Sequence, residues 1–204
     1  YYEGGERTAK WLMGLFGKHT SMANKALLDW GCGPARVLRH FPKLLGNEAE
    51  IHGTDYNPKT IAWCRENIED VTFSNNQLNP PTEYPDGCFD LVYGISIFTH
   101  LSEANHKQWF EELMRITKKG GVLLLTTHGS IFRDKLTEEE RQVFDQGKLV
   151  ERGKVVEGHR VFAAFHPPAF IQQLFESQAE ILEHIEGTRK SWGLEQDVWM
   201  VKKR

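Results

Sequence analysis

Cysteine is scarce in this chain of 204 residues, which has only three: Cys32, Cys64 and Cys88. An odd number without the paired spacing of metal ligands argues against a disulfide framework and against a metal site. Few cysteines also indicate a reducing compartment. Long apolar runs are missing as well, since none approaches the roughly 20 residues of a membrane helix, and residues 1–10 lack a signal-peptide core. We therefore expect a cytoplasmic protein with no metal and no membrane partner.

Basic residues are not in excess either. Lys and Arg number 25 against 28 Asp and Glu, which gives a formal net charge of -3. A chain with this balance has no overall electrostatic attraction to nucleic acid, so we do not expect a nucleic-acid partner. The hydrophobic fraction of 40% is that of an ordinary globular protein. We expect one domain that spans residues 1–204.

Short strand-like apolar runs alternate with longer helical stretches up to residue 127, which predicts an α/β fold with a doubly wound sheet. The expected strands are residues 26–30, 51–55, 71–74, 89–95 and 121–127. The expected helices are residues 6–18, 36–45, a segment that begins near Pro58, and residues 103–117. The pair Gly120-Gly121 is expected to end the last of these helices.

The pattern changes after residue 129, and residues 130–166 predict an insertion beside the carboxyl edge of the sheet. Thr137 and Glu140 have the spacing of a capping box that opens a short helix. Residues 148–157 and 159–165 predict a hairpin that turns near Gly158. A helix over 168–178 and an antiparallel pair of strands over 179–186 and 197–202 follow. The predicted fold is a Rossmann-like, seven-stranded, mostly parallel sheet with an antiparallel last strand and a small helix-hairpin insertion after the fifth strand.

A glycine-rich turn follows the first expected strand, in residues 27–33 (LLDWGCG). Glycines in this place let the chain turn tightly and let a nucleotide lie against the backbone. The dinucleotide spacing G-x-G-x-x-G/A is broken, because Arg36 stands at its last position. Asp29 would repel a pyrophosphate, and its carboxylate suits a cationic group such as the ammonium of a methionine moiety. The turn therefore favours S-adenosylmethionine over NAD.

Asp55 ends the second expected strand. In dinucleotide folds an acidic residue at this place accepts hydrogen bonds from both ribose hydroxyls. The alternative is a cap for the helix that begins near Pro58. Asp29 and the glycines of the first turn favour the ribose role.

Four segments resemble, in order, the motifs of class I S-adenosylmethionine-dependent methyltransferases. They are residues 27–33 (first motif), 53–58 (second motif), 89–96 with 98–101 (fourth-strand motif) and 115–125 (passage into the fifth strand). One departure is Ala35, where many members have a third glycine. Residues 80–81, 163–167 and 196–199 more loosely resemble a bacterial subgroup of methyltransferases (type 11/12/25-like). The resemblance implies S-adenosylmethionine as cofactor and S-adenosylhomocysteine as product.

The resemblance also implies cofactor contacts at the ends of the first four strands. Asn76 and Gln77 follow the third strand, where such enzymes meet the adenine, and a backbone-capping turn residue is the alternative for Asn76. Arg36 and Arg7 are candidates for the methionine carboxylate, against the commoner surface role of arginine. The predicted cofactor-binding residues are Asp29, Trp30, Gly31, Cys32, Gly33, Arg36, Asp55, Tyr56, Asn76, Gln77, Leu78, Tyr93, Gly94 and Ile95.

Methyl transfer is an in-line displacement, and a hydroxyl acceptor also needs a base. His128, at the end of the fifth strand, and His166, at the end of the insertion, are the predicted catalytic residues. A hydrogen-bonded structural histidine is the alternative for each. His100 has a weaker claim, because residues 99–101 resemble a strand-to-helix junction. Trp192, beside Gly193, is the best aromatic candidate for a ligand contact.

The leading hypothesis is an S-adenosylmethionine-dependent methyltransferase (EC 2.1.1.-) that methylates a small-molecule acceptor, on an oxygen of a sugar or another hydroxyl compound. Residues 130–166 are then expected near the acceptor site. The second hypothesis is a methyltransferase that acts on protein or nucleic acid. The acidic balance counts against nucleic acid, and no Asn/Asp-Pro-Pro-Tyr/Phe tetrad follows the fourth strand. The third is a module that binds the cofactor without turnover.

Overall fold

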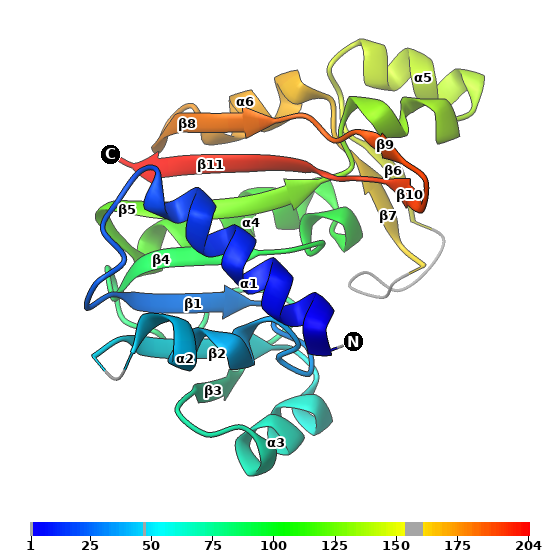
Figure 1. Cartoon of the computed structure of the whole chain (residues 1–204). Coiled ribbons are helices and arrows are strands. Elements are labelled where there is room, and N and C mark those ends of the chain that lie inside the picture. Colours follow the sequence, from blue (N-terminus) through cyan, green and yellow to red (C-terminus); the bar gives the residue numbers. More distant parts are fainter. Residues whose placement is uncertain (1, 47, 154–160) are drawn as a thin grey trace.

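The computed structural model describes residues 2–46, 48–153 and 161–204, built around a seven-stranded sheet (Figure 1). The strand order is β3-β2-β1-β4-β5-β11-β8. The strands are β1 (Ala26–Trp30), β2 (Glu50–Asp55), β3 (Thr72–Asn75), β4 (Phe89–Gly94), β5 (Thr117–Thr127), β8 (Ala179–Ile185) and β11 (Asp197–Lys203). The first five pair with one another in parallel, and β11 is antiparallel to both β5 and β8. The predicted mostly parallel sheet with an antiparallel last strand is confirmed.

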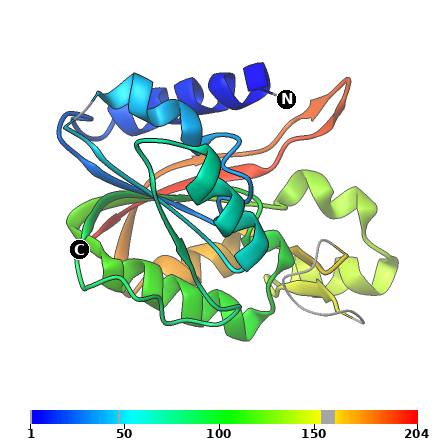
Figure 2. The ribbon, with the colours of Figure 1, turned by 90° about the horizontal axis from the view of Figure 1, so that it is seen from below.

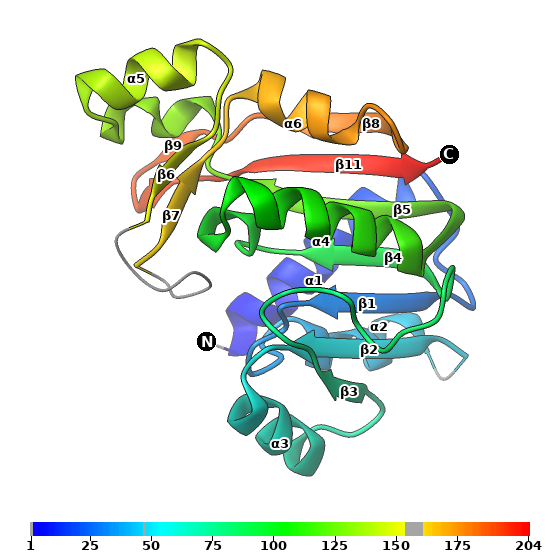
Figure 3. The ribbon, with the colours of Figure 1, turned by 180° about the vertical axis from the view of Figure 1, so that it is seen from behind.

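Helices cover both faces of this sheet (Figures 1 and 3). One face carries α1 (Tyr2–Gly17), α2 (Phe41–Leu45) and α3 (Pro58–Asn67), and the other carries α4 (Glu103–Ile116) and α6 (Pro168–Phe175). Successive residues of β1 serve the two faces in turn, since Leu27 packs with the α1 side and Leu28 with the α4 side. All five residues of β1 are buried, as expected for a parallel strand covered on both sides.

The helix predicted over residues 36–45 is only partly correct, because residues 38–45 are helical but form two short helices. The chain instead forms turns after β1, then a short 3₁₀ helix, η1 (Leu38–His40), and the five-residue α2. Pro42 explains the break, because it stands in the first turn of α2, where a missing N–H costs nothing. A continuous helix from residue 36 would place the same proline in its interior.

The strand β5 begins at Thr117, four residues before the predicted start. Gly120, expected to end a helix, lies inside the strand with a φ of 76°. The pairing of β4 with β5 shifts its register between Phe89 and Leu91, opposite this point. Gly120 therefore accompanies an irregularity in the strand, where glycine accepts the positive φ without strain.

The segment after β5 leaves the sheet, as predicted for residues 130–166. It contains a 3₁₀ helix, η3 (Ser130–Lys135), then α5 (Glu138–Asp145) and the antiparallel pair β6 (Val150–Arg152) and β7 (Ala163–Phe165). The capping box is confirmed, since the Thr137 hydroxyl accepts from the Glu140 N–H and the Glu140 carboxylate accepts from the Thr137 N–H. The predicted turn near Gly158 lies outside the described residues.

A two-stranded ribbon between β8 and β11 was not predicted. It consists of β9 (Arg189–Lys190) and β10 (Gly193–Leu194), which pair antiparallel and carry Trp192 between them. Figure 2 shows the ribbon and the N-terminal end of α1 reaching beyond the sheet at the same end of the molecule. Among the described residues, none of the helices combines the length and the apolar character needed to cross a bilayer.

Candidate cofactor and acceptor site

The turn after β1 is held against the end of β2. The backbone N–H groups of Gly31 and Cys32 both donate to the carbonyl of Thr54, at 2.8 and 2.9 Å. Gly31 and Gly33 have φ angles of 77° and 50°, a region that glycine enters without strain. A side chain on Gly31 would collide with Ile97, whereas the space in front of Gly33 is open. Packing therefore requires that Gly31 has no side chain, whereas Gly33 needs glycine only for its positive φ.

Asp55 lies beside this turn with its carboxylate already oriented. One oxygen accepts from the Gly33 N–H at 3.0 Å and the other from the Asn57 N–H at 2.8 Å. The cap of α3 is Asn57, whose side chain accepts from the N–H groups of Lys59 and Thr60. Asp55 is thus not the cap of α3, the alternative that the sequence analysis had kept for it. Each of its oxygens keeps a lone pair for a further donor.

Asp29 lies beneath the turn and is 5% exposed. Its Oδ2 accepts a hydrogen bond of 2.7 Å from the Tyr93 hydroxyl. Burial raises the pKa of Asp29 to about 7, an effect that the Tyr93 hydrogen bond and the charge of Arg36 reduce and the charge of Asp55 increases. A buried carboxylate of this kind binds a cation well, because the cation replaces the water that the carboxylate has lost.

A narrow cavity opens at the end of β2, and we call it the β2-end cavity. Its walls include Gly31, Asp55, Tyr56, Gln77, Leu78 and His100. Trp30 and Asn76 contribute to the same cavity. The Asn76 amide is engaged on both sides, since its oxygen accepts from the Thr54 hydroxyl and its nitrogen donates to the Gln77 carbonyl. Both polar atoms of the Asn76 amide are thus engaged within the protein, which agrees with the turn-capping role stated as the alternative for it.

Three predicted cofactor residues lie behind the surface. Tyr93 is 1% exposed, and its hydroxyl donates to Asp29. Cys32 is 8% exposed, and burial raises the pKa of its thiol. Gly94 was expected to let the cofactor approach closely, but a Cβ there would lie 2.7 Å from the Trp30 ring. The missing side chain of Gly94 therefore makes room for Trp30.

His166, predicted to line the acceptor pocket, lies in the interior with 1% exposure. Its Nε2 is 2.8 Å from the Nε2 of His106, whose Nδ1 is 2.7 Å from the Ser102 carbonyl. A carbonyl only accepts, so His106 carries its proton on Nδ1 and His166 donates from Nε2. Burial holds the pKa of His166 well below its usual value. This environment suits a neutral structural histidine and gives a soluble acceptor no access to the ring.

His128 is also held in place by the insertion. Its Nδ1 lies 3.0 Å from the Ala164 carbonyl, and its ring packs against Phe132 and Phe165. Burial lowers the pKa of His128 to about 4. His100 makes the equivalent contact two residues earlier on the same segment, 2.8 Å from the Phe162 carbonyl. Of these two histidines, His100 is the one that lines the β2-end cavity, although its sequence context suggested a junction.

A second cavity, of about 660 Å³, lies between α1 and the β9–β10 ribbon, and we call it the α1–ribbon cavity. Its walls include Arg7, Trp11, Arg36, Ile95, Trp192 and Gln196. This volume falls within the range of about 300–1,000 Å³ that is usual for small-molecule sites. The two cavities lie on either side of residues 95–97, because Ile95 and Ser96 line one and Ile97 lines the other.

A polar network that the sequence did not reveal forms one wall of the α1–ribbon cavity. Ser96 follows β4 with a φ of 60°, a conformation that costs a non-glycine residue of the order of 1 kcal/mol. Its N–H donates to the Thr126 hydroxyl at 2.8 Å. The hydroxyls of Ser96 and Thr126 both donate to Oε1 of Gln196, at 3.0 and 2.6 Å. The strained backbone of Ser96 is thus held by the Thr126 hydroxyl of β5, and Gln196 joins the two hydroxyls.

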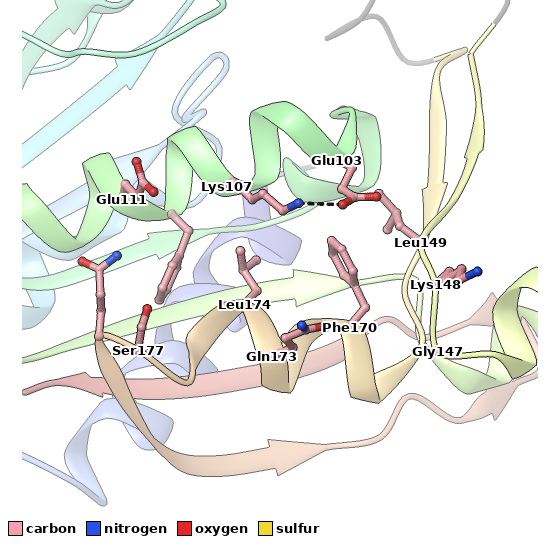
Figure 4. A pocket seen from close by; sticks show the side chains of 12 residues that line it. Glu103, Lys107, Glu111, Gly147, Lys148, Leu149, Phe170, Gln173, Leu174 and Ser177 are labelled. Atoms are coloured by element: carbon pink, nitrogen blue, oxygen red, sulfur yellow. Dashed lines mark hydrogen bonds and ion pairs between the residues drawn. The ribbon is translucent and has the colours of Figure 1, made fainter.

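A further groove lies between α4 and α6, away from the turn after β1 (Figure 4). Lys107 and Glu103 pair across its rim at 2.7 Å, and Phe170 and Leu174 point into it from α6. The groove contains none of the predicted site residues.

The comparisons with known proteins agree with this geometry. Residues 27–121 match the family model described as a methyltransferase domain. The chain is similar to phosphoethanolamine N-methyltransferase of Plasmodium falciparum, with 25% identity over 61% of this chain and 47% of that protein. It is also similar to tRNA (carboxymethyluridine(34)-5-O)-methyltransferase of Arabidopsis thaliana, with 29% identity over 59% of this chain and 28% of that protein. The matched part is less than half of either relative.

Solved structures show the same fold. A SAM-dependent methyltransferase from Methanosarcina mazei superposes with a TM-score of 0.70, at 16% identity over 93% of this chain and 96% of that one. Magnesium protoporphyrin IX methyltransferase from Synechocystis, solved with bound S-adenosylhomocysteine, gives 0.68 at 14% identity, over 100% of this chain and 85% of that one. At such identities the likeness concerns the fold.

The sheet order and the two acidic residues beside a glycine turn define a nucleotide-binding α/β protein whose site suits S-adenosylmethionine. Together with the match of residues 27–121 to the methyltransferase-domain model and the shared fold, they make the chain similar to the class I S-adenosylmethionine-dependent methyltransferases.

Proposed function

We propose that this domain transfers a methyl group from S-adenosylmethionine to a small-molecule acceptor. The observation that carries the proposal is the position of Asp55, whose carboxylate is bound by the Gly33 N–H at the mouth of the β2-end cavity. This hydrogen bond joins the glycine turn after β1 to the end of β2, the two motifs that a cofactor with a ribose would contact. Since the matched part is less than half of the relatives, the activity of the whole protein is part of this proposal.

The residues of the β2-end cavity fit the nucleoside end of the cofactor. The free lone pairs of Asp55 accept from the ribose hydroxyls, and Gln77 and Leu78 lie where the adenine is held. Tyr56, which is 48% exposed, covers the ribose side. Asp29 attracts the ammonium, and Arg36 binds the carboxylate of the methionine end. Each role rests on charge and position, and none requires a metal ligand.

When bound, the cofactor supplies a methyl carbon on a sulfonium, which an acceptor lone pair attacks while the electrons of the broken bond pass to sulfur. The chain's own task is to align the acceptor and to exclude water. We place the acceptor in the α1–ribbon cavity, beside Ile95 and Ser96. Residues 130–166 are then an insertion near that site, since Asp134 pairs with Arg189 of the β9–β10 ribbon. The cavity volume supports a small molecule over a folded macromolecule.

We retain a hydroxyl oxygen, of a sugar or another hydroxyl compound, as the proposed acceptor atom. Such an acceptor must lose a proton, but none of His100, His128 and His166 lines the α1–ribbon cavity in which we place it. Nδ1 of His100 donates to the Phe162 carbonyl, so the neutral ring has its lone pair on Nε2. Because His100 lines the β2-end cavity, its proposed role is a contact with the nucleoside of the cofactor. A nitrogen acceptor or a tRNA, as in the names of the two relatives, is the alternative.

The experiment is a transfer assay with methyl-labelled S-adenosylmethionine and a panel of hydroxyl, amine and tRNA acceptors. We expect labelled product from a hydroxyl compound and none from the Asp55→Ala variant. His100→Gln should weaken the binding of S-adenosylhomocysteine, because the residue lines the cavity of the nucleoside. Product from tRNA or amines alone would overturn the acceptor class, and an unchanged affinity in His100→Gln would remove this histidine from the cofactor site.

A further inference from the structure

The α1–ribbon cavity is lined by two arginines and two glutamates. Within the described part of the chain, neither Arg7 nor Arg36 forms an ion pair. Of the two carboxylates there, Glu195 is engaged by the Thr188 hydroxyl and by Lys190, which leaves Glu186 facing two positive charges. An anion that enters the cavity therefore meets a net positive charge.

The two arginines have different positions. Arg36 belongs to the turn after β1, and its charge acts on the buried carboxylate of Asp29. It is thus placed for the methionine end of the cofactor. Arg7 lies one helical turn from Trp11 on α1, so both side chains are on the same side of the helix, and both line the cavity. Once Arg36 is taken by the cofactor, Arg7 remains for the acceptor.

The opposite wall offers hydrogen-bond donors and an aromatic surface. The Gln196 oxygen already accepts from two hydroxyls, so its amide nitrogen, which only donates, is left for a ligand. Trp192 on the ribbon is 73% exposed and Trp11 on α1 is 42% exposed, although both line the same cavity. Two tryptophans at the mouth of a polar cavity suit a flat or apolar body.

We propose, on the basis of the function proposed above, that the acceptor is a small organic anion with an aromatic or apolar body. Its carboxylate or other anionic group binds Arg7 and the Gln196 amide, and its body lies between Trp11 and Trp192. Glu186, at the rim of the cavity, disfavours a second negative charge there. The anionic group selects the acceptor and takes no part in the transfer itself.

The test uses three probes with the same aromatic body and charges of minus one, zero and plus one: phenylacetate, phenylacetamide and phenethylamine. Their affinities are measured by ligand-observed NMR with the protein saturated with S-adenosylhomocysteine. We expect phenylacetate to bind about tenfold or more tighter than the other two, as for a charged hydrogen bond. Arg7→Gln should abolish that preference, and Lys119→Gln, which removes an equal charge at an exposed residue of β5, should preserve it. Trp192→Ala should weaken all three probes.

Equal affinities for phenylacetate and phenylacetamide, or a preference for phenethylamine, would overturn the inference. So would an Arg7→Gln variant that keeps the preference. Loss of S-adenosylhomocysteine affinity in Arg7→Gln but not in Arg36→Gln would assign Arg7 to the cofactor and overturn it as well. Failure of the wild-type protein to bind S-adenosylhomocysteine would instead refute the proposed function, so the two failures are distinguished.

Discussion

Asp29→Asn is the substitution whose effect the structure predicts in most detail. The pKa of Asp29 is about 7, against an ordinary value of 3.8, mainly because the carboxylate is buried. A difference of about 3 units corresponds to about 4 kcal/mol between the protonated and ionised forms. The Tyr93 hydroxyl, which donates to Asp29, can donate equally to an asparagine oxygen. The substitution therefore removes the charge and keeps the shape.

The raised pKa of Asp29 determines how cofactor affinity depends on pH. An ammonium favours the ionised carboxylate, so the wild-type affinity for S-adenosylmethionine should rise with pH and level off above pH 7. At pH 6, where about one Asp29 in ten is ionised, the affinity should be about tenfold below that plateau. In Asp29→Asn the dependence should vanish, and the plateau affinity should fall by about 30-fold, which is a charged hydrogen bond of about 2 kcal/mol.

Isothermal titration calorimetry between pH 5.5 and 7.5 measures both effects, and it stays below the pH at which α-amino groups begin to lose their proton, about 8. Stability gives an independent readout. Because the pKa of Asp29 is raised in the folded state, its contribution to stability is complete below pH 3.8 and is lost as the pH rises towards 7. Without cofactor, Asp29→Asn should therefore be more stable than wild type at pH 8. A wild-type affinity that does not change with pH, or an Asp29→Asn variant with unchanged affinity, would refute the reasoning.

Three further substitutions test the site's framework. Gly31→Ala should destabilise the protein by more than about 2 kcal/mol in urea denaturation, since the residue has a φ of 77° and its Cβ would collide with Ile97. The double variant Gly31→Ala, Ile97→Ala should recover part of that loss. A double variant as unstable as Gly31→Ala alone would contradict the collision. In His166→Phe, stability should fall less between pH 7 and pH 5 than in wild type. The pKa of His166 is depressed in the folded state, so its contribution to stability is present above pH 6.5 and is lost as the pH falls below that value. A pH dependence of stability equal to that of wild type would contradict this. Asp197→Ala should lower the free energy of unfolding by about 1–3 kcal/mol in thermal unfolding, since this buried carboxylate accepts from His184 and from the Gly187 N–H. An unchanged stability would show that these hydrogen bonds are unimportant.

The order of strands and helices follows from local patterns, so the sequence predicted it well. Apolar runs, Asn57-Pro58 before a helix and the capping box of Thr137 are read within a few residues. The helix predicted after β1 is divided into two short helices because Pro42 restricts it. The β9–β10 ribbon was missed because two strands of two residues carry almost no periodicity.

The cofactor-site residues were predictable where each lies in a short sequence segment that is recognisable by itself. Asp55 and Gly33 lie 22 residues apart in the sequence, yet each belongs to a recognisable segment, and the structure joins them. The acceptor side was not predictable in the same way. Ser96, Thr126 and Gln196 meet only because three distant segments converge. The burial of His166 depends on His106, 60 residues away, and no local pattern signals it.

The central claim is that this chain binds S-adenosylmethionine through Asp55 and the turn after β1. Calorimetric titration of the wild-type protein and of Asp55→Ala with S-adenosylhomocysteine, and separately with NAD, tests it most directly. We expect the wild type to bind S-adenosylhomocysteine and not NAD, and Asp55→Ala to bind it about 10–100-fold more weakly, the cost of lost charged hydrogen bonds. Binding of NAD without S-adenosylhomocysteine, or an unchanged affinity in Asp55→Ala, would contradict the account.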